Sequence, residues 1–164
     1  MAAANPHRYG LWLSLLLWAT LCPTISSAQS FREGWSTVSD RRLGLIVQYP
    51  AQVFVVNAGK TEKHQGSRFR TSDGRAEFVY YGFPNNSRES PAAYLKRTLL
   101  MDRTRLIYQR VTENFFVISS SRQGRIFYSR CNFGDLVRCI YLEYPADEKL
   151  GWDNIVARIS YSLR

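Results

Sequence analysis

Few side chains in this 164-residue sequence could carry out nucleophilic catalysis. The chain has two histidines, and only His64 remains if the N-terminal segment is removed as a signal peptide. Ser119, Ser120 and Ser121 end a predicted strand and could display a nucleophile, but they do not form the G-x-S-x-G turn of many serine hydrolases. We therefore expect His64 to be a surface histidine and predict no catalytic residue. An envelope hydrolase that uses these serines is kept as an alternative.

Four carboxylates near the C-terminus could form an acid–base pair: Glu143, Asp147, Glu148 and Asp153. A glycosidase needs two carboxylates at a defined separation, and this spacing does not set one. The structural interpretation is that Asp147 and Glu148 suit the positive end of a helix, while Glu143 meets an arginine across a sheet. The sequence carries no recognisable zinc, calcium or P-loop motif, so we predict no metal site and no cofactor.

Residues 1–28 have the pattern of a cleaved signal peptide. Arg8 gives a positive start, residues 11–22 are almost wholly apolar, and small residues precede the expected cleavage site. Pro23 ends the apolar run short of the about 20 residues that a transmembrane helix needs. We expect a periplasmic or secreted protein that does not span the membrane after processing, with a short leader at 29–34 and a single domain at 35–164.

Cysteine usage agrees with export. Removal of the signal peptide discards Cys22 and leaves Cys131 and Cys139, an even pair in an oxidising compartment. We expect these two residues to form a disulfide, and the alternative is a pair of buried free thiols. Their spacing is not C-x-x-C, which argues against a thioredoxin-like redox role.

The mature chain is predicted to consist of short strands separated by turn sequences, together with two helices. One helix begins at Ser90 as N-cap and runs to about Asp102, and the other occupies 146–163 with Trp152 in its packing face. Residues 57–67 are expected to be a polar loop. The predicted strands are Leu45–Tyr49, Val53–Val56, Arg68–Thr71, Glu77–Tyr81, Leu106–Val111, Phe115–Ser119, Ile126–Arg130 and Cys139–Tyr144.

A disulfide between Cys131 and Cys139 would also set the register of the last hairpin. Phe127 would then lie opposite Glu143, and Tyr128 opposite Leu142. In this register Ile126, Tyr128, Ile140 and Leu142 share one face of the sheet.

The order of several motifs resembles the PsbP-like α/β/α sandwich family. The resemblance covers about Trp35 to Leu163. The chain resembles more closely still a group of small exported proteins of alphaproteobacteria that have no established activity. Each motif is generic turn chemistry alone, and their order carries the resemblance. The motifs are Trp35, the extended segment Arg42–Pro50, Ser72-Asp73-Gly74-Arg75-Ala76, Gln123-Gly124-Arg125-Ile126-Phe127-Tyr128 and Glu143-Tyr144-Pro145-Ala146 before a terminal helix.

The resemblance implies an α+β fold with an antiparallel β-sheet of about six strands flanked by helices. The family includes a photosystem accessory subunit and a nuclear factor that binds a small GTPase, and no site residue of either carries over to this chain. The resemblance therefore implies non-catalytic binding work of unspecified kind, because a fold alone does not define a function.

Positive charge is the strongest compositional signal. The chain carries 22 lysines and arginines against 13 aspartates and glutamates, and only Arg8 lies in the predicted signal peptide, which lowers the formal net charge from +9 to +8. An anionic partner is favoured, and the alternative is an evenly spread, solvated surface. The candidate binding residues lie on one strand and around the disulfide hairpin: Arg68, Arg70, Arg122, Arg125, Arg130 and Arg138.

Export excludes nucleic acid as a good candidate partner. The remaining anionic partners are an acidic envelope polymer, lipid head groups or an acidic protein. We predict a non-enzymatic binding or accessory domain for one of these, with an envelope hydrolase or a small-ligand carrier as alternatives.

Overall fold

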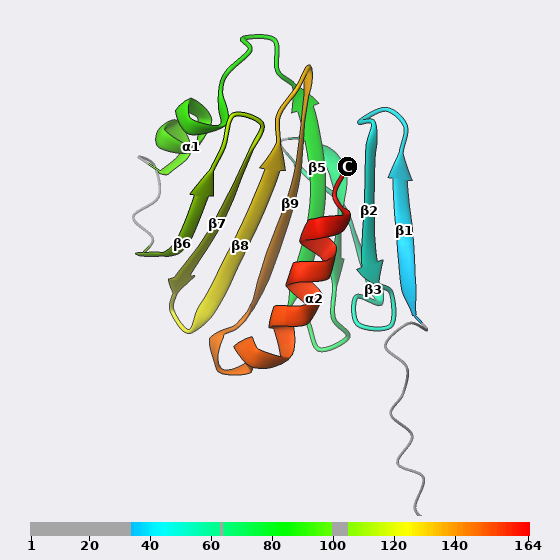
Figure 1. Ribbon diagram of the computed structural model, residues 1–164. Helices are drawn as coiled ribbons and strands as arrows, with labels where there is room; N and C mark the ends of the chain where they lie inside the picture. The colour runs from blue at the N-terminus through cyan, green and yellow to red at the C-terminus, as the bar shows by residue number, and fades with distance from the viewer. Residues whose placement is uncertain (1–33, 63, 100–104) are drawn as a thin grey trace, which may run out of the picture. The chain divides into compact units, whose positions relative to one another are not determined.

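The computed structural model describes residues 34–62, 64–99 and 105–164. The predicted signal peptide, and all of the predicted leader except Gly34, lie outside these residues. Within them, a hairpin of β1 (Trp35–Asp40) and β2 (Leu45–Pro50) stands beside a larger antiparallel sheet (Figure 1).

The larger sheet has seven strands among the described residues, in the spatial order β3-β4-β5-β9-β8-β7-β6. The last strand of the chain, β9, therefore lies in the middle of the sheet, between β5 and β8. The strands of this sheet are β3 (Val56–Lys60), β4 (Gln65–Arg70), β5 (Glu77–Pro84), β6 (Arg105–Val111), β7 (Phe115–Arg122), β8 (Arg125–Asn132) and β9 (Leu136–Pro145).

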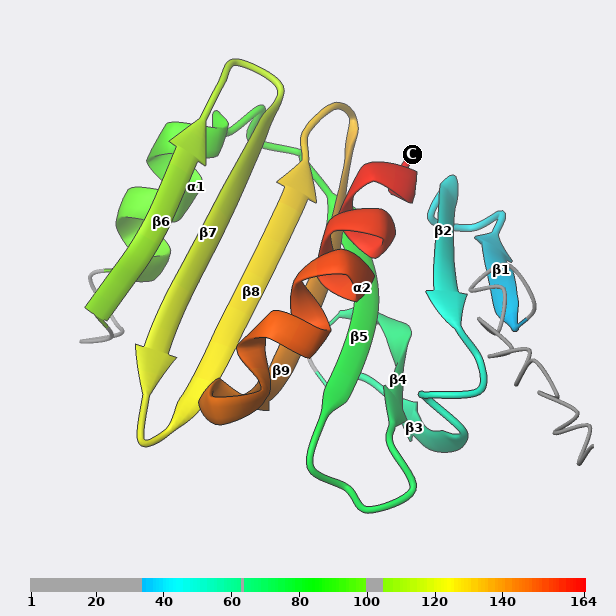
Figure 2. The same ribbon diagram turned by 60° about the horizontal axis from the view of Figure 1, so that its bottom comes forward.

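The helices lie on opposite faces of this sheet (Figures 1 and 2). A short 3-10 turn, η1 (Ala146–Glu148), leads into α2 (Lys149–Ser162), which packs on one face together with the β1–β2 hairpin. We call this the α2 face. The other face, the α1 face, is covered at one end by α1 (Pro91–Leu99), which begins after Ser90 as predicted, with the Ser90 hydroxyl accepting a hydrogen bond from the Ala93 amide at 3.2 Å.

The α2 face holds the larger hydrophobic core because alternate residues of the strands point toward the helix. Phe78, Ile140 and Leu142 are fully buried there, and Ile159 and Trp152 of α2 close over them. The predicted packing role of Trp152 is confirmed. The chain end is held to β2, because Ile46 and Arg164 exchange two backbone hydrogen bonds of 3.0 Å.

The predicted register of the last hairpin is confirmed. Cys131 lies opposite Cys139 and the two form a disulfide with a Cα–Cα distance of 4.1 Å. Phe127 faces Glu143 and Tyr128 faces Leu142. The disulfide is buried on the α1 face in a second, smaller core beneath Leu95 of α1.

Two expectations for the N-terminal half are wrong. Residues 53–55 of the predicted strand Val53–Val56 do not form a strand, because Val53 and Phe54 both donate to the Pro50 carbonyl and close a turn that buries Phe54. The predicted loop at 57–67 instead contains most of β3 and the start of β4, paired antiparallel with a register shift between Asn57 and Lys60. Strand β1, which begins at Trp35, was not among the predicted strands.

In the described ranges the sheet thus has seven strands where about six were expected, plus the separate hairpin. The end of the first predicted helix, beyond Leu99, lies outside the described residues.

We expect the double variant Cys131→Ala/Cys139→Ala to be less stable than the oxidised protein by about 2.5 kcal/mol, because the cross-link closes a short loop in the unfolded chain. The urea midpoint of unfolding, measured for both proteins, checks this. Equal midpoints would show that the disulfide does not stabilise the fold.

Candidate binding site on the α1 face

The six candidate arginines do not share one surface. Arg130 and Arg138 lie on the α2 face, where they serve the fold: Arg130 donates to the Ser160 carbonyl at 3.1 Å, and Arg138 donates to the Leu43 carbonyl at 3.1 Å. The other four, Arg68, Arg70, Arg122 and Arg125, lie on the α1 face, beyond the end that α1 covers.

The sequence contained a signal for this division. Neighbouring residues of a strand point to opposite faces. Arg130 precedes Cys131 and Arg138 precedes Cys139, so neither arginine can share the face of the disulfide. The predicted register would have separated the two arginines from the α1 face.

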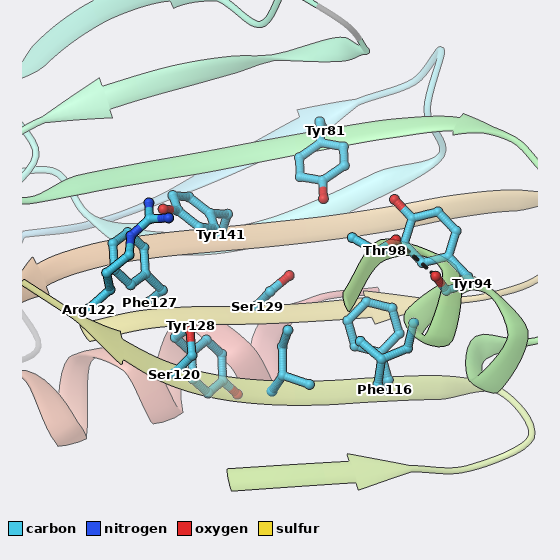
Figure 3. A pocket seen from close by; sticks show the side chains of 12 residues that line it. Tyr81, Tyr94, Thr98, Phe116, Ser120, Arg122, Phe127, Tyr128, Ser129 and Tyr141 are labelled. Carbon is cyan, nitrogen blue, oxygen red and sulfur yellow. Dashed lines mark hydrogen bonds between the residues drawn. The ribbon is translucent and has the colours of Figure 1, made fainter. Parts of the chain in front are cut away.

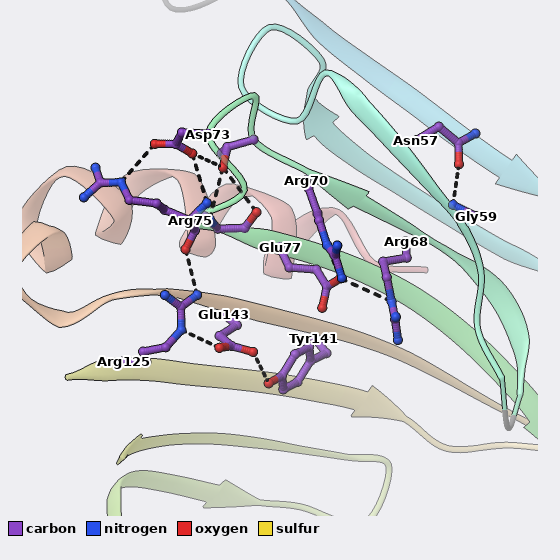
Figure 4. A network of polar contacts seen from close by, with 12 residues as sticks. Asn57, Gly59, Arg68, Arg70, Asp73, Arg75, Glu77, Arg125, Tyr141 and Glu143 are labelled. Carbon is purple, nitrogen blue, oxygen red and sulfur yellow. Dashed lines mark hydrogen bonds and ion pairs between the residues drawn. The ribbon is translucent and has the colours of Figure 1, made fainter. Parts of the chain in front are cut away.

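Arg68 and Arg70 share one carboxylate. Arg68 Nε lies 3.2 Å, and Arg70 Nε 3.1 Å, from the same oxygen of Glu77 on the neighbouring strand β5 (Figure 4). Arg68 Nε is buried and makes no hydrogen bond within the part of the chain that the structure describes. Two guanidinium groups therefore face a single carboxylate, which leaves an excess positive charge at this point.

A second network of polar contacts lies beside this pair. Arg125 forms an ion pair with Glu143, as predicted, and donates through Nη2 to the Arg75 carbonyl at 2.7 Å. Tyr141 donates its hydroxyl to the other oxygen of Glu143 at 3.1 Å (Figure 4). Burial raises the pKa of Tyr141, and the nearby Glu143 carboxylate raises it further. This tyrosine stays protonated and holds the carboxylate in place for Arg125.

The turn before β5 anchors the same region. Asp73 accepts hydrogen bonds from the Thr71 hydroxyl at 2.6 Å and from the backbone and side chain of Arg75, which hold the pKa of Asp73 well below its usual range. Arg75 also pairs with Glu148 before α2. The turn is thereby tied to the start of the terminal helix.

Two cavities open on the α1 face, on either side of Tyr81 and Tyr141, which line both. The cavity next to α1 has a volume of about 220 Å³, and the hydroxyl groups of Tyr81, Tyr94 and Ser129 point into the same space (Figure 3). Burial raises the pKa of Tyr81, against a weaker opposing effect of its hydrogen bond with Ser129.

The second cavity, of about 290 Å³, contains Arg68, Glu77 and His64 in its lining. Arg122 lies at the end of β7 and lines the first cavity. Its guanidinium carbon is 5.3 Å from the centre of the Phe127 ring. Arginine, tyrosine and phenylalanine side chains therefore line the part of this face that α1 leaves open, together with Glu62 and Glu77.

The hydrolase alternative gains no support from these positions. His64 stacks on Tyr81 and Phe83 of β5, with ring centres 5.3 and 4.7 Å apart. Ser120 lies on β7, which is three strands from β5 in the sheet. At the usual strand spacing this places Ser120 about 14 Å from the rings on which His64 stacks. Ser119 lines a groove on the opposite face.

Three of the four C-terminal carboxylates, Glu143, Glu148 and Asp153, are engaged in structural contacts. Glu148 pairs with Arg75 and accepts from the Trp152 indole at 3.2 Å, while Asp153 pairs with Lys149 at 2.8 Å. Across the described ranges, no group of three histidine, cysteine or carboxylate side chains is arranged to hold a metal ion.

Comparison with known proteins identifies the fold. No protein-family model matches the chain, and no curated protein is similar to it in sequence. Among solved structures, the cyanobacterial PsbP protein (CyanoP) of Synechocystis sp. PCC 6803 matches with a TM-score of 0.62 and 12% sequence identity, over 87% of this chain and 99% of that one. This likeness supports a PsbP-like fold. The closer resemblance to alphaproteobacterial exported proteins stays a prediction.

None of the helices in the described ranges has the length and apolar character that crossing a membrane requires.

Proposed function

We propose that the mature chain is an exported, non-enzymatic accessory domain that binds an acidic protein through the open part of its α1 face. The observation that carries the proposal is the sharing of Glu77 by Arg68 and Arg70. A carboxylate supplied by a partner would balance the second guanidinium, and arginine–carboxylate pairs are among the stronger charge-assisted hydrogen bonds.

The composition of the face favours a protein over a polymer or a lipid surface. Arginine and tyrosine are enriched at the energetic centres of protein interfaces. Beside Arg68 the face presents Tyr81 and Tyr141, which line two cavities that side chains of a partner could enter. An accessory role is also compatible with the PsbP-like fold, because the resembled family includes an accessory subunit.

The disulfide supports an extracytoplasmic location. Disulfides persist in oxidising compartments, and the Cys131–Cys139 bridge is buried and complete in the fold. Together with the signal-peptide pattern of residues 1–28, this supports export to the periplasm or the exterior.

The test is retention of acidic proteins from the envelope fraction of the protein's own cells. The wild-type domain and the variant Arg68→Gln/Arg70→Gln are co-sedimented with that fraction at low and at physiological salt, and retained proteins are identified by mass spectrometry. We expect salt-sensitive retention of an acidic protein by the wild type. Its affinity, measured with the purified partner, should fall by about tenfold or more in the variant, because each lost charge-assisted hydrogen bond is worth about 1.5–3 kcal/mol.

A charge-matched control separates this site from general basicity. Arg41 in the β1–β2 turn and Arg164 at the chain end are exposed and lie outside the α1 face. The variant Arg41→Gln/Arg164→Gln should bind like the wild type. Equal losses in both variants, or retention of anionic polymer or lipid without protein, would overturn the proposal.

The small-ligand carrier remains a second candidate because of the cavity beside Tyr81 and Tyr94, about 220 Å³ in volume. Native mass spectrometry of the domain recovered from its own cells tests this candidate. A bound small molecule would support it, and an unmodified mass would count against it.

A further inference from the structure

The opposite face of the sheet contains a groove that is separate from the cavities of the α1 face. It lies on the α2 face, where α2 covers the middle of the sheet and leaves β6 and β7 open (Figure 2). Its volume is about 660 Å³, within the range of sites for small organic ligands.

Apolar side chains from both sides line this groove. Val117 of β7 lies in its lining, α2 contributes Val156 and Tyr161, and the edge strand β6 contributes Ile107 and Tyr108. The pairing of β6 with β7 shifts register between Leu106 and Tyr108, and this bulge lets two consecutive residues line the same groove. Ile107 is 52% exposed and Tyr161 81% exposed, so the groove presents apolar surface to water.

Two arginines stand over one aromatic ring in the same groove. The guanidinium carbon of Arg130 lies 4.9 Å, and that of Arg110 5.4 Å, from the centre of the Phe115 ring. The register explains this closeness, because Arg110 of β6 and Arg130 of β8 both pair with Val117 of the strand between them.

This arginine pair differs from Arg68 and Arg70 in having no carboxylate. Within the described residues, neither Arg110 nor Arg130 forms an ion pair with an acidic side chain. The carboxylate in the groove lining, Asp153, is occupied by Lys149. Arg130 is held by the Ser160 carbonyl and by the Asn132 side chain, with 3.1 Å in each case.

We propose that this groove binds a small amphiphilic anion. Its apolar body lies along Val117 and Ile107, and its carboxylate or phosphate head group lies at Arg110 and Arg130. Guanidinium groups match both head groups through paired hydrogen bonds. An anion there is attracted to two guanidinium groups that form no ion pair among the described residues, and the apolar body removes exposed Ile107 from water.

The test uses decanoate as the probe, with decanol as a neutral molecule of the same chain length. Isothermal titration of the oxidised mature domain should show binding of decanoate and at least tenfold weaker binding of decanol. Arg110 is exposed and makes no hydrogen bond that the fold depends on in the described residues, so Arg110→Gln should fold normally and weaken decanoate binding by about tenfold.

Arg97→Gln is the matched control, because Arg97 also stacks on an aromatic ring, 5.1 Å from the centre of Tyr94, but belongs to α1 on the other face. It should bind decanoate like the wild type. Equal affinities for decanoate and decanol, or equal losses in the two variants, would overturn the proposal.

Vesicles of phosphatidylglycerol, compared with phosphatidylcholine, distinguish a free amphiphile from a lipid head group. Binding of decanoate in solution that depends on Arg110 indicates a free ligand, and Arg110-dependent binding only to the anionic vesicles indicates a head group. Binding to neither overturns the proposal. The variant Arg68→Gln/Arg70→Gln should keep decanoate binding, so failure of the proposed protein-binding function would not affect this result.

Discussion

Gly66→Ala is expected to destabilise the domain by about 3 kcal/mol or more, or to prevent folding. Gly66 is buried in β4, and a Cβ there would lie well within 3.0 Å of the Tyr80 carbonyl oxygen and of the Tyr81 backbone on β5. Those neighbours are backbone atoms of a paired strand and cannot rotate away. Either the β4–β5 pairing opens or the strand shifts, and overpacking of this kind typically costs about 1–3 kcal/mol and sometimes more.

Chemical denaturation of the variant checks this result, with Gly151→Ala as the control. Gly151 lies in α2 and is exposed, and a Cβ added at this position would have no neighbouring atom within 4 Å. That substitution should stabilise the domain by about 0.5–1 kcal/mol, because glycine is a poor helix former. A Gly66→Ala protein as stable as the wild type would show that β4 does not approach β5 as described.

Stability should fall steeply above pH 10. Among the described residues, five tyrosines have a raised pKa, and burial is the main cause for each. Burial raises the pKa of Tyr144 to about 12. The tyrosine phenols thus bind their protons more tightly in the folded state than in the unfolded chain, where tyrosines have a pKa near 10. The stabilisation is complete below pH 10 and is lost as the pH rises toward the folded values. The other four tyrosines are Tyr81, Tyr94, Tyr128 and Tyr141.

The loss for each such tyrosine is at most about 1.4 kcal/mol per pH unit. Several acting together would remove most of a typical stability of about 5–15 kcal/mol within one or two pH units. Urea unfolding at a series of alkaline pH values, followed together with phenolate absorbance, measures this dependence.

Tyr144→Phe removes one ionising group while keeping the ring that stacks on Trp152, 5.4 Å away between centres. Its stability should decline less steeply with pH than that of the wild type. Identical slopes would mean that Tyr144 ionises as easily in the folded protein as in the unfolded chain.

Local pairing explains which parts of the fold could be predicted. The β8–β9 hairpin was correct in register because a short turn and two cysteines constrain strands that are adjacent in the sequence. The packing face of α2 was correct for a similar reason, since Trp152, Val156 and Ile159 follow helical periodicity.

Non-local pairing explains what could not be predicted. The position of β9 between β5 and β8 joins strands about 60 residues apart, and no local pattern specifies it. The β3–β4 hairpin is polar and contains Gly59 and Gly66, so its sequence is that of a loop. These residues form strands because β4 pairs with β5 and β3 pairs with β4.

The candidate site shows the same limit. Arg68 and Arg70 were identified from their charge and alternation, but Glu77 became their shared partner only through the β4–β5 register. Likewise, Arg110 and Arg130 are 20 positions apart, and only the order β6-β7-β8 brings both to the ring of Phe115.

The two faces of the sheet therefore present different chemistry. On the α1 face, Arg68 and Arg70 share the Glu77 carboxylate beside two cavities that tyrosines line. This arrangement suits a partner with acidic side chains. On the α2 face, two arginines without a carboxylate stand at the end of an apolar groove, which suits a small amphiphile. Variants on one face leave the other intact, so each assignment can be tested alone.

Chemical footprinting of arginines tests the central proposal most directly. The domain is treated with phenylglyoxal alone and in complex with the acidic protein retained from the envelope, and modified residues are quantified by mass spectrometry. We expect Arg68 and Arg70 to be protected in the complex, while Arg41 and Arg164 react as in the free domain. Unchanged reactivity of Arg68 and Arg70 in a saturated complex would contradict the assignment of this face as the binding surface.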